Sequence, residues 1–372
     1  MQFIDLHRQF NEIEQEVRNR FDKILEHKGF IGGQEVKEIE KELAEYVGVK
    51  HVICCASGTD ALTIPLKAYD LKKNDAVFVP SFTFFASAES ITLAGGTPIF
   101  VDSDYETYNI DTDDLVEKIE MILRNGEYNP RGIVAVDLFG QPANFNRIKQ
   151  IAEKYNLFIL EDGAQGFGGS INGKKACSFG NVAATSFFPA KPLGCYGDGG
   201  AIFTDDDKLA NLIESIHVHG KGSDKYDNVR IGYNSRLDTF QAAVLLEKMK
   251  IFDQELIKRN NIAQLYSERL AEYFEVPKVL DGYNSSWAQF TLKTKDESSR
   301  DYIVDKMKNA GIPVMVYYPI PIHKSGAYKN NIQYKLPICE ELSKKVFSIP
   351  MHPYLSNEEI DMICDTLISI VK

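Results

Sequence analysis

The sequence predicts an α/β fold: a large domain built on a mostly parallel β-sheet, followed by a smaller α+β domain. Short apolar runs alternate with segments of helical periodicity through the first two thirds of the chain. The runs are almost continuously apolar, as expected when helices cover both faces of a parallel sheet. A chain of 372 residues, 44% hydrophobic and 26% charged, is long enough for two domains that share one large core.

Two helices are expected first, because residues 8–27 and 33–47 carry apolar side chains at helical spacing and Gly29, Gly32 and Gly33 interrupt the pattern. Strands and helices then alternate. The expected strands are His51–Cys55, Ala76–Pro80, Thr97–Asp102, Gly132–Gly140, Leu157–Gln165, Val182–Phe188 and Gly199–Thr204. Ligands bind at the carboxyl ends of such strands, so polar and aromatic residues that follow a strand are candidates for a site.

The last third of the chain is expected to form the smaller domain. A polar, glycine-rich loop with Asn234 and Arg236 leads into a helical pattern from about Gln241 to Arg269, which is long enough to bridge two domains. We expect domains at residues 1–245 and 246–372, packed tightly because no linker rich in Pro, Gly or Ser separates them. The expected later elements are a strand near Trp287–Leu292, helices near Ser299–Ala310 and Glu340–Val346, and a proline-stiffened loop at Tyr317–His323.

Composition excludes several classes of protein. The net charge of −11, without a basic block, argues against nucleic acid or an anionic membrane surface as the main partner. The N-terminus does not resemble a signal peptide, and no apolar run approaches about eighteen residues, so we expect a cytoplasmic protein. The six cysteines form no C-x-x-C pair, which favours buried, reduced thiols over disulfides or a zinc site.

Lys191 is the strongest candidate for a reactive side chain. It follows Phe187, Phe188, Pro189 and Ala190, and Pro192 pushes its backbone out of the helical region. A lysine desolvated on such a fixed turn loses affinity for its proton and becomes a nucleophilic amine able to form a Schiff base. Most lysines are surface charges, which is the alternative for this one.

A phosphate site is expected where the first strand turns into a helix. Gly58 allows close approach to the helix N-terminus, Ser57 and Thr59 add hydroxyls, and Ser186 lies five positions before Lys191. Simple N-capping by Ser57 or Thr59 is the alternative.

Two further strand ends carry candidate ligands. Glu161 and Asp162 stand where the apolar run Leu157–Leu160 stops, and Phe84 follows the strand that ends at Pro80. The carboxylate could instead cap the next element, and the aromatic ring could belong to the core.

Other motifs are rejected. The stretch from Gly168 to Lys174 matches G-x-x-x-x-G-K, but Lys175 stands where a nucleotide-binding P-loop needs Ser or Thr. His217 and His219 have no third ligand nearby in the sequence, so no metal is expected. There is no G-x-G-x-x-G after a strand and no G-x-S-x-G.

The remaining features together match one cofactor. A reactive lysine, a carboxylate for a pyridinium nitrogen, a phosphate cup at a helix start and an aromatic ring to stack are what pyridoxal 5′-phosphate (PLP) requires. The chain resembles the DegT/DnrJ/EryC1/StrS family of sugar aminotransferases over nearly its whole length. The segments that carry the resemblance are FIGGQEVKEIEKELAEYVGVKHVICCASGTDAL, VPSFTFFAS, EDGAQGFGG, SFFPAKPLGCYGDGGAI, GYNSRLDTFQAAVL and YYPIPIH.

The resemblance implies the PLP-dependent transferase fold type I and a role for each matching residue. Lys191 resembles the lysine that bonds to PLP, and Asp162 the partner of the pyridine nitrogen. Gln165 is similar to the residue near the 3-oxygen of the ring, and Phe84 to the stacking aromatic. Gly58, Thr59 and Ser186 resemble the phosphate cup. Asn234 resembles the residue that reaches the phosphate from a neighbouring subunit, which implies a homodimer with shared sites.

The substrate is the less specific part of the resemblance. Many relatives have a histidine two residues before Pro-x-Lys, where this chain has Phe187 and Phe188. The segment looks most similar to the branch that acts on nucleotide-linked N-acetyl sugars, including 3-keto uronic acids, with amination at C3 or C4 and L-glutamate as donor. Surface polysaccharide or glycan biosynthesis is the implied pathway. Arg236, Tyr317 and His323 are the substrate candidates, although His323 could be a residue that packs its loop.

Two alternatives stay open at this point. One is a PLP-dependent sugar dehydratase, which resembles the same fold but carries histidine in place of the lysine. The other is a non-catalytic protein of the PLP fold that acts as a regulator or binding module.

Overall fold

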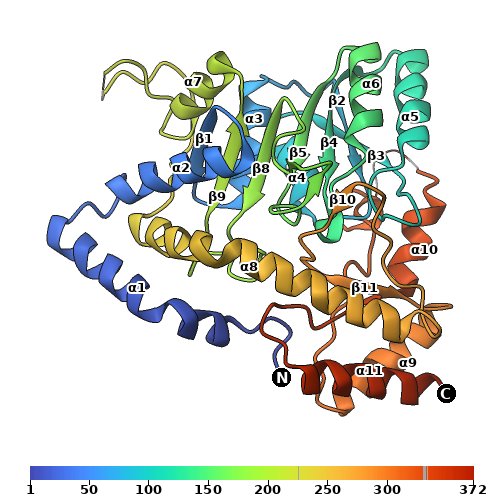
Figure 1. Ribbon diagram of the computed structural model, residues 1–372. Helices are drawn as coiled ribbons and strands as arrows, with labels where there is room; N and C mark the ends of the chain where they lie inside the picture. Colours follow the sequence, from blue (N-terminus) through green and yellow to red (C-terminus); the bar gives the residue numbers. More distant parts are fainter. Residues whose placement is uncertain (225, 330–331, 333) are drawn as a thin grey trace.

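The computed structural model describes residues 1–224, 226–329, 332 and 334–372, and it is built around a seven-stranded sheet (Figure 1). The strand order is β1-β9-β8-β5-β4-β2-β3. Neighbouring strands from β8 to β3 are parallel, and β9 runs antiparallel to both β1 and β8. The predicted mostly parallel sheet is therefore confirmed.

The bounds of the elements follow the alternation expected from the sequence. The strands are β1 His51–Cys55, β2 Asp75–Pro80, β3 Thr97–Val101, β4 Asn129–Val136, β5 Phe158–Asp162, β6 Ser170–Ile171, β7 Lys174–Lys175, β8 Val182–Ser186, β9 Gly200–Thr204, β10 Tyr283–Asn284, β11 Phe290–Lys293 and β12 Val346–Ile349. The α-helices are α1 Leu6–His27, α2 Gln34–Val47, α3 Gly58–Ala68, α4 Ala86–Leu93, α5 Thr112–Asn125, α6 Phe145–Tyr155, α7 Asp207–Ile216, α8 Thr239–Leu270, α9 Glu297–Asn309, α10 Pro337–Lys345 and α11 Asn357–Val371.

Both faces of the sheet are covered, which explains why its strands are apolar throughout. On β2, Val77 and Val79 join the core that contains α3, α4 and α7, whereas Ala76 and Phe78 join the core that contains α5 and α6. A third core forms where α2 and α8 pack on β1, β8 and β9. In Figure 1, α8 crosses in front of the sheet and α3 and α4 lie behind it.

Helix α8 belongs to two cores. Its first half, including Leu245 and Phe252, packs on the sheet, and its second half, including Ile262 and Tyr266, packs on β11, β12, α9 and α11. The start of the chain lies against this second core, because Arg8 forms a bidentate ion pair with Glu359 on α11 (Figure 1). We retain as a proposal the division into residues 1–245 and 246–372.

Two of the predicted strands end three or more residues earlier than expected. The strand predicted to reach Gly140 ends at Val136, because the Asp137 carboxylate accepts a hydrogen bond from the Ala143 amide and Phe139 turns the chain with φ of 60°. The strand predicted to reach Gln165 ends at Asp162, where the Ala164 amide donates to the Asp162 carboxylate. In both places a carboxylate binds a nearby backbone amide and starts a turn.

The rejected P-loop segment has another structure. Residues 168–175 form the short hairpin β6–β7, with Gly173 at its turn, and β10 adds a third strand. A P-loop would instead lead from a strand into a helix.

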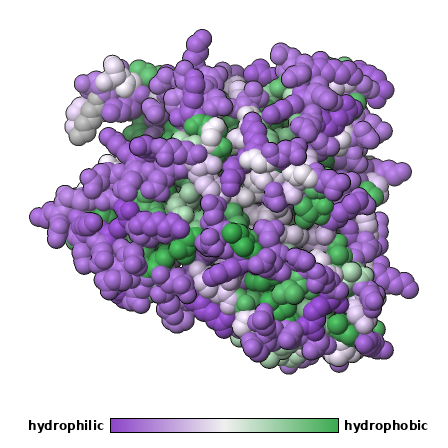
Figure 2. All heavy atoms as spheres, viewed as in Figure 1, coloured by the Kyte–Doolittle hydropathy of each residue, from purple (hydrophilic) through white to green (hydrophobic). Residues whose placement is uncertain are grey.

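The surface in Figure 2 is mostly hydrophilic, with small apolar patches along α8. All six cysteines are free and buried, as predicted. Within the described part of the chain, no helix has both the length and the apolar character that crossing a membrane requires.

The second core can be tested with one substitution made at two sites. Leu292 on β11 is fully buried, whereas Leu123 on α5 is 53% exposed. Leu292→Ala should lower the free energy of unfolding by about 2–5 kcal/mol, since it removes a buried side chain and leaves a cavity. Leu123→Ala should change it by less than about 0.5 kcal/mol. Urea unfolding of both variants measures the difference, and equal effects would contradict the assignment of Leu292 to a core.

Candidate active site

The centre of the site is formed by Asp162, the last residue of β5, and Lys191. Asp162 is buried, and its carboxylate accepts hydrogen bonds from the Ser87 hydroxyl (2.7 Å) and the Ala164 amide (3.2 Å). Burial raises the pKa of Asp162, while the hydrogen bond from Ser87 and the charge of Lys191 lower it. Burial likewise lowers the pKa of Lys191, and the Asp162 charge opposes that shift. The two residues predicted to be catalytic therefore lie within electrostatic reach of each other.

The backbone around Lys191 is a compact turn. The Lys191 amide donates to the Phe188 carbonyl (2.9 Å), and the Cys195 amide donates to the Phe187 carbonyl (2.8 Å). A Cβ on Gly194 would lie 2.6 Å from the carbonyl oxygens of Phe188 and Pro189, so the turn has no room for a side chain there. The lysine is held on a fixed, non-helical segment, as its position before proline predicts.

The expected phosphate cup lies at the start of α3. Ser57 caps the helix, because its hydroxyl accepts from the Asp60 amide (3.1 Å). Ser57 thus has the capping role given as the alternative, but the first amides of the helix still have no intrahelical acceptor. A Cβ on Gly58 would lie 2.5 Å from Cβ of Ser186, so these two predicted cup residues face each other closely.

Phe84 and Gln165 both lie near Tyr318. The Phe84 ring is 57% exposed although it follows a buried strand, and its centroid is 6.3 Å from that of Tyr318. An aromatic ring left uncovered beside buried polar groups is available to stack on a ligand. Gln165 is buried, donates to the Tyr318 hydroxyl (3.0 Å) and accepts from the Phe139 amide (2.8 Å).

Asn234 and Arg236 are exposed, and the Arg236 guanidinium donates to the Asn234 side-chain oxygen (2.7 Å). Between them, Ser235 is buried and donates to Asp60 on α3 (2.6 Å), and its hydroxyl accepts from the Ala56 amide (3.1 Å). Ser235 therefore anchors this loop to the phosphate-cup turn, while its two neighbours point outward.

The two C-terminal candidates have different surroundings. Tyr317 is half-buried, and its ring is 6.2 Å from that of Phe3. His323 is buried, with Nδ1 at 2.7 Å from the Ser81 hydroxyl and Nε2 at 3.3 Å from Glu340. Both ring nitrogens have protein partners, which matches the loop-packing alternative, so a substrate role for His323 stays a prediction.

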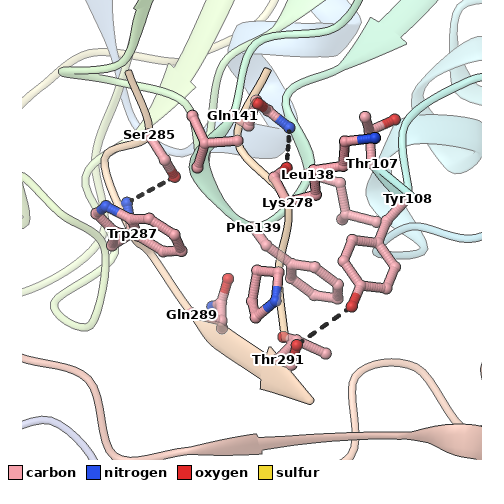
Figure 3. Close-up of a pocket in the computed structure, with 12 residues that line it drawn as sticks. Thr107, Tyr108, Leu138, Phe139, Gln141, Lys278, Ser285, Trp287, Gln289 and Thr291 are labelled. Atoms are coloured by element: carbon pink, nitrogen blue, oxygen red, sulfur yellow. Dashed lines mark hydrogen bonds between the residues drawn. The ribbon is translucent and has the colours of Figure 1, made fainter. Parts of the chain in front are cut away.

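A small cavity lies beside Phe139, between the sheet and the second core (Figure 3). Its walls are tied by hydrogen bonds from Gln141 to the Lys278 carbonyl and from Tyr108 to the Thr291 carbonyl. Its volume of about 20 Å³ is the space of roughly one water molecule, far too small for a sugar. None of the predicted site residues lines it, so this cavity is not the candidate active site.

Three contacts were missed by sequence reasoning: Ser87 on Asp162, and Tyr318 and Phe139 on Gln165. Tyr318 lies next to the candidate Tyr317 in the predicted loop Tyr317–His323, so Tyr318 could have been considered as well. Ser87 gave no signal of its own, because a serine near a helix start is ordinarily read as a cap.

Comparison with known proteins agrees with this geometry. The model of the DegT/DnrJ/EryC1/StrS aminotransferase family matches residues 11–368. The chain belongs to this family. It is 42% identical over 99% of both chains to the UDP-2-acetamido-2-deoxy-3-oxo-D-glucuronate aminotransferase of Pseudomonas aeruginosa.

Two solved structures extend the comparison. A DegT DnrJ EryC1 StrS aminotransferase from Brucella abortus has a TM-score of 0.97 and 46% identity, covering 100% of this chain and 99% of that one. A Bacillus subtilis protein with bound cofactor PMP has a TM-score of 0.91 and 31% identity, covering 100% of this chain and 85% of that one. The predicted family, fold type I, aminotransferase class and PLP cofactor are confirmed.

The residues of this chain also fit PLP on their own geometry. The site combines a buried carboxylate, a desolvated lysine and an uncovered phenyl ring. It also includes a helix start at Gly58, where any side chain would collide with Ser186. Each of these is a group that one part of PLP needs. The individual roles of the site residues stay predictions.

The lowered pKa of Lys191 gives a test on the cofactor-free protein. Only the neutral amine reacts with an acylating reagent, so labelling of Lys191 should begin at lower pH than labelling of the exposed Lys41. Asp162→Asn removes the charge that raises the Lys191 pKa, so it should move that onset to still lower pH. Competitive labelling read by mass spectrometry measures both, and an onset that rises in the variant would contradict the pairing.

Proposed function

We propose that the protein transfers the amino group of L-glutamate to the C3 keto group of a UDP-linked N-acetyl sugar or sugar acid, using PLP. The relative from Pseudomonas aeruginosa, named for a UDP-linked 3-oxo sugar acid, supports this substrate class. The observation that carries the proposal is the amine of Lys191, desolvated and within electrostatic reach of the buried carboxylate of Asp162. Biosynthesis of a surface polysaccharide or glycan remains the proposed setting, in the cytoplasm.

PLP, when bound, supplies an electron sink that stores the amino group between the two half-reactions. Lys191 would hold the cofactor, and its freed amine would then act as the base that accepts a proton from Cα of glutamate. Its lowered pKa favours the neutral form that this step requires. Asp162 would hold a proton on the pyridine nitrogen, and Phe84 would stack on the ring. Gln165 is fixed by hydrogen bonds with Phe139 and Tyr318 and would contact the 3-oxygen.

The ligand's charged groups need donors. The helix dipole and amides of Gly58 and Thr59, with the Ser186 hydroxyl, hold the cofactor phosphate. Arg236 is exposed and offers a planar guanidinium suited to a diphosphate or a carboxylate. Tyr317, and His323 if its contacts rearrange, complete the substrate candidates.

We further propose a homodimer in which Asn234 serves the site of the neighbouring subunit. In the single chain the Asn234 side chain is exposed, and its only recorded hydrogen bond within the described residues is to Arg236. In a dimer, this outward-facing amide would be able to form a hydrogen bond in the site of the second chain.

Amine transfer can be followed directly. L-glutamate should shift the absorbance of the bound cofactor, and a UDP-linked 3-keto sugar should restore it. Lys191→Ala should lower the turnover number by about 10²–10⁴-fold, because the proton transfer loses its base. Lys41→Ala, which changes an exposed lysine, is the matched control and should be unaffected.

The same experiment separates the alternatives. A non-catalytic binding module would show no spectral change with glutamate. A dehydratase would release water from the sugar without adding nitrogen. NMR of the product assigns the aminated carbon, and an amine at C4 would overturn the proposed position.

Shared sites predict complementation. Lys191→Ala and Asn234→Ala should each impair the homodimer, but in a mixed dimer one site receives native Lys191 from one chain and native Asn234 from the other. Mixing the two variants under conditions that allow subunit exchange should therefore restore activity. Each unmixed variant is the control. No recovery, despite mixed dimers on native mass spectrometry, would contradict the shared site.

A further inference from the structure

The short segment Thr83–Ser87 reaches Asp162 from another part of the sheet. Ser87 is the second residue of α4, is 1% exposed, and donates its hydroxyl proton to Oδ2 of Asp162 at 2.7 Å. The Thr83 hydroxyl lies 3.2 Å from the Ser87 hydroxyl and is 3% exposed. Because Ser87 gives its only proton to the carboxylate, Thr83 must be the donor in that second contact.

The Ser87 hydroxyl does not cap its own helix. The N-cap residue of α4 is Phe85, and the helix has no side-chain cap. A serine at this place could satisfy a helix amide, but its side chain points to β5 instead. The chain of hydroxyls from Thr83 through Ser87 to Asp162 therefore serves the carboxylate.

The carboxylate keeps free acceptor positions. Oδ2 accepts from Ser87 and Oδ1 accepts from the Ala164 amide, whereas a carboxylate offers about four acceptor positions. The two protein donors fix the plane of the carboxylate and leave room for a further N–H donor. Phe84, within the same segment as Thr83 and Ser87, is the predicted stacking residue, so one segment would supply both the stacking ring and a donor to the carboxylate.

We propose that Ser87, oriented by Thr83, is a positioning residue that holds the Asp162 carboxylate ionised and aimed at the pyridine nitrogen of the cofactor. This inference rests on the proposed role of Asp162. A purely structural role, in which Ser87 only ties α4 to β5, is the alternative that an experiment must exclude.

The Ser87 hydrogen bond opposes the effect that burial has on the pKa of Asp162. Burial raises the pKa of Asp162, and the Ser87 hydrogen bond is the largest of the influences that lower it, ahead of the Ala164 amide and Lys191. The charge of Asp162 also raises the pKa of three neighbouring titratable groups, Asp137, Cys177 and Tyr318. Glu161, next in sequence, turns the other way and accepts from the Phe179 amide (2.7 Å).

Ser90 provides a matched control on the same helix. It is also fully buried, but its hydroxyl donates to the Ser87 backbone carbonyl (3.2 Å) and does not contact Asp162. Ser87→Ala and Ser90→Ala thus remove the same group from neighbouring turns of α4. Only the first removes a donor to the carboxylate.

The test uses the full-length enzyme with PLP. Ser87→Ala should weaken PLP binding by about tenfold or more, as expected for a lost hydrogen bond to a charged group. It should also move the acid limb of the pH profile of the glutamate half-reaction to higher pH, because the pKa of Asp162 rises. Thr83→Ala should shift both in the same direction by less, and Ser90→Ala should shift neither.

The outcomes separate this inference from the proposed function. If Ser87→Ala lowers the melting temperature as Ser90→Ala does but leaves PLP affinity and the acid limb unchanged, Ser87 is structural and the inference is overturned. The inference is equally overturned if Ser90→Ala reproduces both shifts. If the wild-type protein neither binds PLP covalently at Lys191 nor reacts with glutamate, the proposed function itself has failed.

Discussion

The site depends on the stabilisation of one carboxylate, that of Asp162, in a place that water hardly reaches. Asp162 ends a central strand of the sheet and is 4% exposed, where an isolated charge would be strongly disfavoured. Two hydrogen bonds and the nearby amine of Lys191 offset part of the loss of hydration, so the pKa of Asp162 remains raised. The same burial lowers the proton affinity of the lysine. One desolvated pair thus places a buried carboxylate within electrostatic reach of an amine whose pKa is lowered.

The fold explains why these groups meet. The carboxyl ends of parallel strands lie along one edge of the sheet, and β2, β5 and β8 bring Phe84, Asp162 and Ser186 to that edge or just beyond it. The start of α3 reaches the same region, because Gly58 faces Ser186 without an intervening side chain. Helices on both faces of the sheet support this edge, where four separate segments meet.

Much of this arrangement could be predicted because its signals are local. Strand alternation, the lysine before proline and the strand end at Pro80 are all readable within short windows, whereas the strand that ends at Asp162 was predicted to run to Gln165. Contacts between distant segments were not readable. Ser87 and Asp162 are 75 positions apart, and Gln165 and Tyr318 are 153 apart, so neither pairing leaves a pattern in the chain. The antiparallel course of β9 was equally hidden, since a buried strand has the same apolar run in either direction.

The central claim is that the amine of Lys191 is the group that PLP bonds to. Borohydride reduction of the PLP-loaded protein, followed by proteolysis and peptide mapping, tests it most directly. The account predicts a single pyridoxyl label at Lys191, which L-glutamate added before reduction removes. A label on another lysine, or none, would contradict it.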